Sequence, residues 1–225
     1  FGSRGVEGKI SVVKHCRTQN LPYLGICLGF QVAVIEFARN VMGLKDANST
    51  EMDPNARDPV ISELPDQKKV EQLGGSMRLG GQDVLLQPGT LAWHLFDRKD
   101  TVRQRFRHRY EVDPSYVERL EAAGLVFSGR HPKYPIMQIV ELPMTDTDPG
   151  REAAAAGKPT HPFFVAGQFH PELTGGPLRP QPMFVGLLAA AVRRKYPDAD
   201  TPAWTRGQEG PTTTDVSSPT SSSPS

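Results

Sequence analysis

One short stretch limits what this chain can fold into more than any other. Residues 21–31 read LPYLGICLGFQ, an apolar run followed by a cysteine between Gly25 and Gly29. The apolar run predicts a short buried β-strand, and apolar side chains recur at helical spacing from Phe30 to Val41. A strand that passes through a Gly-x-Cys-x-Gly turn directly into a helix predicts an α/β fold with the cysteine at the turn.

Cys27, the cysteine at this turn, has a functional and a structural interpretation. A nucleophile on a sharp strand-to-helix turn occupies strained backbone, and Gly25 and Gly29 on either side would relieve the crowding. The following helix would stabilise a Cys27 thiolate, and the backbone N–H of Leu28 would point to where an oxyanion forms. A small buried cysteine at a tight turn explains the same pattern, so the motif alone leaves both interpretations open.

Hydrophobic periodicity predicts further elements along the chain. We expect helices at 5–18, 30–41, 115–123 and 183–196, and strands at 21–26, 101–112, 125–131, 135–142 and 162–169. In the strand at 101–112, Arg103, Arg105, Arg107 and Arg109 alternate with apolar and aromatic residues, so these arginines should share one face. The order helix, strand, helix near the start favours a mostly parallel sheet.

A cysteine nucleophile requires a base, and His170 has the most suggestive setting among the six histidines. It ends the predicted strand at 162–169 and is followed by Pro171 and Glu172. Residues two apart in an extended segment point the same way, so Glu172 could hold the imidazole in one tautomer. Carboxyl ends of parallel strands lie at one edge of a sheet, where Cys27 and His170 would meet. A turn histidine beside a solvated acid is the alternative, but the two signals together favour a Cys-His-Glu triad.

Two groups of motifs resemble a known family. PYLGICLGFQ and QFHPE together resemble the class I (triad-type) glutamine amidotransferases. FGSRGVEGK, DANSTEM, LGGSMRLG and RHRYEV are similar to the glutaminase domain of the CTP synthases, and the similarity runs from Phe1 to about Tyr196. The resemblance implies a three-layer α/β fold with a mostly parallel central sheet and a nucleophile elbow, in a domain at 1–204.

The same resemblance implies roles for the residues of the two motifs. Cys27 would attack the side-chain amide of L-glutamine and form a γ-glutamyl thioester with loss of ammonia. His170 would protonate the ammonia and then activate water, while Glu172 orients His170. The backbone N–H of Leu28 would supply one half of the oxyanion hole.

Four positions match family residues that hold glutamine: Leu28, Gln31, Glu51 and Arg109. The chemistry of two of them suits an amino acid. The Glu51 carboxylate can bind an ammonium group, and the Arg109 guanidinium can bind a carboxylate with two parallel hydrogen bonds. From the residues alone, a solvated loop carboxylate and a solvated strand arginine explain these two positions equally.

The resemblance also implies partners that lie outside this chain. In the CTP synthases, ammonia passes to an amidoligase domain of the same polypeptide, which uses ATP, Mg²⁺ and UTP, while GTP activates glutamine hydrolysis. The full-length proteins form homotetramers and filaments. We expect no cofactor and no metal site in this chain. The glycine-rich LGGSMRLGG lacks the residue order of a phosphate-binding P-loop, which argues against an independent ATP site.

The termini and the composition add three expectations. The family has a Gly-Gly pair just before the position of Phe1, so we expect a fragment that lacks the first strands and is weakly active or inactive. The alternative function is that of an interaction or assembly module only. Residues 205–225 are rich in Ser, Thr and Pro and predict a disordered tail.

A net charge of +1 gives no argument for binding to nucleic acid or to a membrane. The cysteines Cys16 and Cys27 are expected to be reduced thiols in the cytoplasm.

Overall fold

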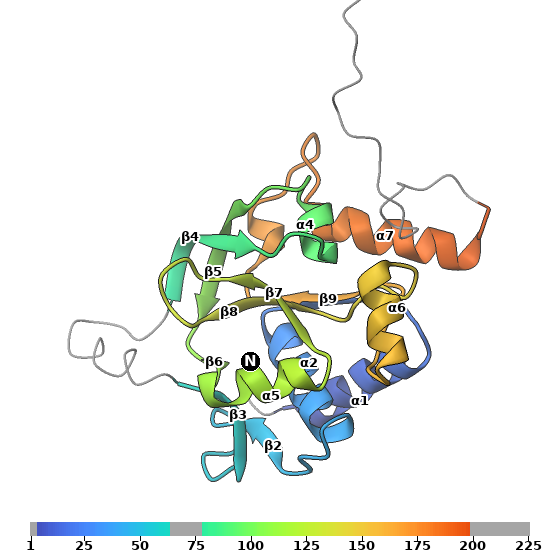
Figure 1. The fold of residues 1–225 in the computed structure, drawn as a ribbon. Coiled ribbons are helices and arrows are strands. Elements are labelled where there is room, and N and C mark those ends of the chain that lie inside the picture. Colours follow the sequence, from blue (N-terminus) through green and yellow to red (C-terminus); the bar gives the residue numbers. More distant parts are fainter. Residues whose placement is uncertain (1–3, 64–77, 199–225) are drawn as a thin grey trace, which may run out of the picture.

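The computed structural model describes residues 4–63 and 78–198, and it places a central sheet between two groups of helices (Figure 1). The helical elements are α1 (Val6–Thr18), α2 (Leu28–Asn40), α4 (Leu91–Leu95), α5 (Pro114–Ala122), α6 (Asp148–Ala155), η2 (Pro171–Leu173) and α7 (Pro182–Lys195). The strands are β1 (Tyr23–Ile26), β2 (Ala47–Ser49), β3 (Asp58–Ser62), β4 (Arg78–Leu86), β5 (Thr101–His108), β6 (Glu111–Val112), β7 (Val126–Arg130), β8 (Met137–Glu141) and β9 (Phe164–Gly167). The four predicted helices are confirmed to within two residues at each end.

Six strands form the main sheet in the order β1-β9-β8-β7-β4-β5, and β2, β3 and β6 form a smaller sheet. The predicted α/β fold is confirmed. The expected parallel pairing occurs between β1 and β9, whereas the other described pairings of the main sheet are antiparallel. Chain length explains one of these, because residues 131–136 alone join β7 to β8 and a parallel crossover needs about a dozen residues or more.

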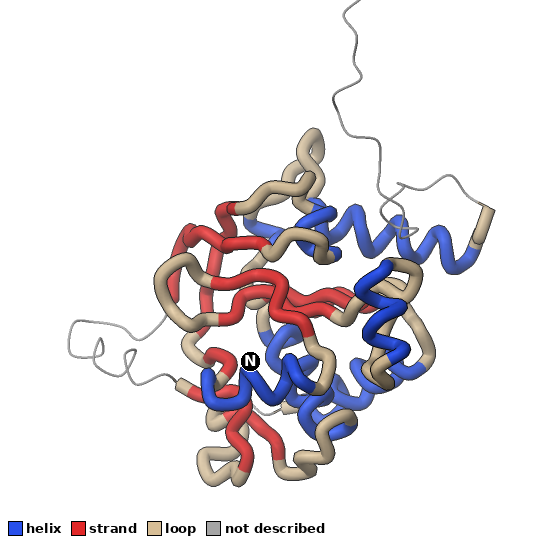
Figure 2. Tube along the Cα trace, in the orientation of Figure 1, coloured by secondary structure: helices blue, strands red, loops and turns tan. Residues whose placement is uncertain are grey.

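The main sheet has a helical layer on each face, as the predicted three-layer arrangement requires (Figures 1 and 2). On one face, α1, α2 and α5 enclose a core that includes Phe30, Phe37 and Phe164. On the other face, α4 and α7 cover a second core around Phe163 and Phe169. The sheet therefore separates two hydrophobic clusters, and α2 is buried along most of its length.

The turn between β1 and α2 is tight because of Gly25. A Cβ atom on Gly25 would lie 2.7 Å from the Ala166 Cβ and 2.8 Å from the backbone of Gly29. Cys27 has φ 52° and ψ −100°, a strained conformation for a residue with a side chain. The predicted elbow is confirmed, but the predicted role of Gly29 is wrong, since a Cβ there would meet only the Tyr23 Oη at 3.6 Å.

A buried ion pair joins α1 to α2. Arg17 donates from Nε and Nη2 to the two carboxylate oxygens of Glu36, at 2.9 and 2.8 Å. The Glu36 side chain is 0% exposed and that of Arg17 is 12% exposed. The charges must therefore satisfy each other, because water cannot reach the carboxylate.

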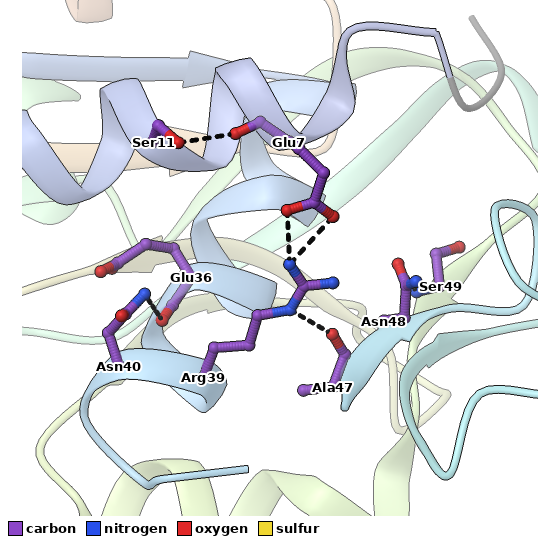
Figure 3. A network of polar contacts seen from close by, with 8 residues as sticks. All are labelled: Glu7, Ser11, Glu36, Arg39, Asn40, Ala47, Asn48 and Ser49. Carbon is purple, nitrogen blue, oxygen red and sulfur yellow. Dashed lines mark hydrogen bonds and ion pairs between the residues drawn. The ribbon is translucent and has the colours of Figure 1, made fainter. Parts of the chain in front are cut away.

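Arg39 ties the same two helices to the small sheet (Figure 3). Its Nε donates to the Ala47 carbonyl oxygen in β2 at 2.6 Å, and its Nη1 donates to both carboxylate oxygens of Glu7 in α1, at 3.0 and 2.8 Å. Because β2 leads directly into the turn that carries Glu51, Arg39 fixes the position of that turn relative to α2.

Glu111 joins the two sheets at the end of β5. It is fully buried, and its Oε1 accepts hydrogen bonds from Arg78 Nε at 2.6 Å and pairs with His108 Nε2 at 2.9 Å. The predicted strand at 101–112 is interrupted here, since β5 ends at His108 and the chain bends before β6. Arg109 therefore leaves the alternating face that sequence analysis assigned to it.

Another buried carboxylate, Glu141 at the end of β8, caps the short helix α4. Its two oxygens accept hydrogen bonds from the backbone N–H groups of Leu91 and Ala92, at 2.7 and 2.9 Å. It fills the place of the missing backbone acceptors at the start of that helix.

Some predictions fall outside the described residues. These are the tail at 205–225 and residues 73–77 of the glycine-rich segment; Gly80 and Gly81 of that segment lie in β4. In the part of the chain that the structure describes, no helix is long and apolar enough to cross a membrane.

The packing around Gly25 predicts a destabilising substitution. Gly25→Ala should lower the free energy of unfolding by about 1–3 kcal/mol, because the added Cβ overlaps the Ala166 Cβ. Gly29→Ala is the matched control and should be neutral or stabilising, by up to about 1 kcal/mol, as Ala favours a helix over Gly. Urea denaturation of the two variants measures the difference, and equal effects would contradict the packing argument.

The ion pair between α1 and α2 predicts a second stability effect. Arg17→Met should cost about 3–5 kcal/mol in unfolding free energy, because it leaves the Glu36 carboxylate buried without a partner. The double variant Arg17→Met/Glu36→Leu should recover most of that loss. Glu7→Gln, which removes a 73%-exposed partner of Arg39, should cost less than about 1 kcal/mol in the same denaturation experiment.

Candidate active site

Cys27 and His170 both follow the carboxyl ends of the two parallel strands. Ile26 at the end of β1 pairs with Gly167 at the end of β9, and the Cys27 N–H donates to the Gly167 carbonyl oxygen at 2.8 Å. His170 comes three residues after Gly167, and its N–H donates to the Arg105 carbonyl oxygen in β5 at 2.8 Å. The sheet thus brings both residues to one edge, as sequence analysis predicted.

His170 and Glu172 lie in direct contact. His170 Nδ1 is 2.6 Å from Glu172 Oε1. A carboxylate only accepts, so Nδ1 carries the proton and Nε2 keeps its lone pair. That Nε2 is buried and has no hydrogen-bond partner among the described residues, which leaves it open to accept a proton.

The local backbone differs from the one that suggested this contact. Sequence analysis placed His170 and Glu172 in an extended segment, where residues two apart point the same way. Instead β9 ends at Gly167, and Pro171–Leu173 form the 3₁₀ turn η2 directly after His170. The turn folds the Glu172 carboxylate back onto the imidazole, so the contact is present for a different geometric reason.

The environment of the Cys27 sulfur raises its pKa. Burial is the largest cause, and hydrogen bonds from the Leu28 backbone N–H and the Gln168 side chain oppose it, while the Glu172 and Glu51 carboxylates add to the rise. Sequence analysis had expected the following helix to favour the thiolate. The raised pKa favours the thiol form of Cys27, and attack by sulfur then requires removal of a proton.

Glu51 lies in the turn after β2, and Arg109 lies in the bend between β5 and β6. Burial raises the pKa of the Tyr110 phenol, and the neighbouring Glu51 and Glu63 carboxylates raise it further, while Arg109 opposes them. The Arg109 Nε lies 3.9 Å from Glu63 Oε1, and the Arg109 side chain is 45% exposed. The Glu51 carboxylate influences both Cys27 and Tyr110, whereas the Arg109 guanidinium influences Tyr110.

Gln31 and Gln168 complete the polar surroundings of Cys27. The Gln31 Nε2 donates to the Tyr110 carbonyl oxygen at 3.1 Å and to Gln168 Oε1 at 3.2 Å. The Gln168 Nε2 donates to the Cys27 Sγ at 3.6 Å. The sequence pointed to Gln31 but not to Gln168. The feature that could have indicated Gln168 is a polar residue directly after the apolar run FFVAG, which contains the fully buried strand β9.

Both cysteines are free thiols, as predicted. Residues 4–63 and 78–198 contain no group of three or more His, Cys, Asp or Glu side chains placed to hold a metal ion. The groups described above are a thiol, an imidazole and two carboxylates: Cys27, His170, Glu172 and Glu51.

Comparison with known proteins identifies the family to which the chain belongs. The model of the family "Glutamine amidotransferase class-I" matches residues 1–190. The CTP synthases of Archaeoglobus fulgidus and Saccharolobus solfataricus are each 49% identical to this chain, over 193 and 192 residues. These matches cover 86% and 85% of this chain but 33% and 32% of the relatives, so the chain spans about a third of their length.

A solved structure agrees with the sequence matches. The glutaminase domain of Trypanosoma brucei CTPS with bound acivicin is 34% identical and superposes with a TM-score of 0.74, covering 86% of this chain and 68% of that one. Its fold is therefore shared over most of both chains. This chain belongs to the class-I glutamine amidotransferase family and has the fold of a CTP synthase glutaminase domain.

Proposed function

We propose that this chain is the glutaminase part of a CTP synthase and that, within that protein, it hydrolyses L-glutamine to glutamate and ammonia. The observation that carries the proposal is the placement of Cys27, in a strained backbone conformation, and of the His170–Glu172 pair after the ends of the paired strands β1 and β9. The family membership and the CTP synthase relatives supply the substrate class.

In the first half of the proposed reaction, His170 Nε2 takes the Cys27 proton. The sulfur then attacks the side-chain amide carbon of glutamine, and the Leu28 N–H stabilises the oxyanion that forms. The carbon–nitrogen bond breaks as His170 returns the proton to the leaving ammonia. The products of this step are ammonia and a γ-glutamyl thioester on Cys27.

In the second half, His170 takes a proton from a water molecule, and the hydroxide attacks the thioester carbon. The carbon–sulfur bond breaks, the sulfur regains its proton from His170, and glutamate leaves. Glu172 holds the imidazole in the required tautomer through both halves and stabilises the imidazolium.

The charged groups near Tyr110 suit the two ends of the amino acid. We assign the Glu51 carboxylate to the glutamine ammonium group and the Arg109 guanidinium to its carboxylate. Leu28 and Gln31 would line the same pocket from the start of α2. The Arg109 side chain is 45% exposed and its ion pair with Glu63 is long, at 3.9 Å, so a substrate carboxylate could replace Glu63 as its partner.

The fate of ammonia extends the proposal beyond this chain. It would pass to an amidoligase domain that uses ATP and Mg²⁺ to aminate UTP to CTP, with GTP as the activator of glutamine hydrolysis. Assembly into homotetramers and filaments, and a cytoplasmic location, belong to the same proposal. The length of the CTP synthase relatives, about three times the matched region, is consistent with such a further domain.

Acivicin, a glutamine-mimicking electrophile, tests the nucleophile without needing ammonia transfer. Mass spectrometry should find one adduct on Cys27 and none on Cys16, because only Cys27 follows a strand end that is paired with the strand before His170. Cys16→Ser should still be labelled and Cys27→Ser should not. Labelling of Cys16 alone, or of neither cysteine, would refute the assignment.

The base is tested by glutamate release. His170→Asn should slow glutamine hydrolysis by about 10²–10⁴-fold, the usual contribution of a general acid–base group. His15→Asn is the matched control, since His15 is exposed on α1 and should leave the rate unchanged. A chain that fails to release glutamate yet still reacts at Cys27 would support the alternative of an interaction or assembly module.

A further inference from the structure

A side chain outside the proposed triad also touches the reactive sulfur. We propose that Gln168 is a positioning residue that presents a fixed hydrogen-bond donor to Cys27 Sγ and stabilises its thiolate. The inference rests on the proposed function only in that Cys27 is taken as the nucleophile.

The orientation of the Gln168 amide follows from its partners. The Tyr110 carbonyl oxygen can only accept, so the Gln31 atom 3.1 Å from it must be the amide nitrogen. That nitrogen also donates to Gln168 at 3.2 Å, which requires the Gln168 oxygen to face it. The Gln168 Nε2 is then left to face Cys27 Sγ, at 3.6 Å. The Tyr110 carbonyl oxygen thus fixes the orientation of the Gln31 amide. The Gln31 amide in turn fixes that of Gln168, so that an N–H donor faces the sulfur.

The amide is held in place from two directions. Gln168 is fully buried, and its backbone N–H donates to the Gln138 carbonyl oxygen in β8 at 2.9 Å. Gln31 is 3% exposed and lies in the first turn of α2, which is itself buried. Because both anchors belong to rigid elements, the donor needs no rearrangement when charge develops on sulfur.

The sulfur needs such a donor for an electrostatic reason. Burial works against the thiolate, and the Glu172 and Glu51 carboxylates repel it further. The Leu28 N–H is the other donor to the sulfur, but the proposed oxyanion requires that same N–H. Gln168 can stay on the sulfur throughout, so the thiolate keeps one donor both when it attacks and when it leaves the thioester.

The test measures the pH dependence of Cys27 alkylation by iodoacetamide in the full chain, with Cys16 of the same molecules as the internal reference. Gln168→Glu keeps an acceptor for Gln31 but removes the donor to sulfur. Gln168→Leu removes both contacts. Each variant should slow Cys27 alkylation at pH 7.5 at least tenfold and move the midpoint of its pH profile upward, while the high-pH plateau and the Cys16 profile stay unchanged.

Gln104→Glu is the matched control. Gln104 is another buried glutamine, and its Oε1 accepts from Thr174 Oγ1 and Gln181 Nε2 at 3.2 and 3.4 Å, contacts that a carboxylate retains. The Cys27 profile of this variant should match that of the parent. Circular dichroism verifies folding, and Gln168→Asn, whose amide is one methylene too short, replaces any variant that does not fold.

The outcomes separate this inference from the proposed function. Unchanged Cys27 midpoints in folded Gln168 variants would overturn the role of Gln168, even if the chain hydrolyses glutamine. Shifted midpoints in a chain that neither reacts with acivicin nor releases glutamate would uphold the role of Gln168 and refute the glutaminase assignment.

Discussion

The parallel pairing of β1 with β9 is the constraint on which the site depends. The two strands stay in register to their carboxyl ends, and the ladder closes with the Cys27 N–H on the Gly167 carbonyl oxygen. Gly25 allows this close approach, because a side chain there would overlap Ala166. The paired ends of β1 and β9 therefore set the position of Cys27, directly after β1. They also set that of His170, three residues after the end of β9.

The second requirement is that polar contacts hold the elements around this edge against one another. Helix α2 carries Leu28 and Gln31 and is buried in one of the two cores. The Arg17–Glu36 pair fixes α2 against α1, and Arg39 connects both to β2 (Figure 3). On the far side, Glu111 holds the small sheet against β5, which keeps Tyr110 beside Gln31. A continuous set of polar contacts thus supports the groups that flank the sulfur.

Much of the fold was predictable because periodicity reports burial directly. The helices, the elbow at Cys27 and the placement of Cys27 and His170 at one edge follow from apolar spacing and from where apolar runs stop. The function came from motif resemblance, since the residues alone left Glu51 and Arg109 open to ordinary surface roles.

What sequence could not supply is geometry that depends on contacts far apart in the chain. The η2 turn brings Glu172 onto His170, although strand spacing had suggested an extended backbone. Arg109 leaves the arginine face because Glu111 draws the chain into another sheet. Gln168 escaped notice because its partners, Gln31 and Cys27, lie 137 and 141 residues away. The raised pKa of Cys27 likewise depends on burial, which local sequence does not report.

Protonation of the Glu141 carboxyl group, which caps α4, is coupled to the stability of the fold. Burial raises the pKa of this carboxyl from its ordinary 4.5 to about 7, even though two backbone N–H groups favour its charged form. Between those values the folded chain holds a proton that the unfolded chain releases, so this group's contribution to stability falls as pH rises from about 4.5 to 7. Cys27 has the opposite preference, because its thiolate forms more readily as pH rises. The stabilising protonation of Glu141 and the thiolate of Cys27 are therefore favoured at opposite ends of the pH range.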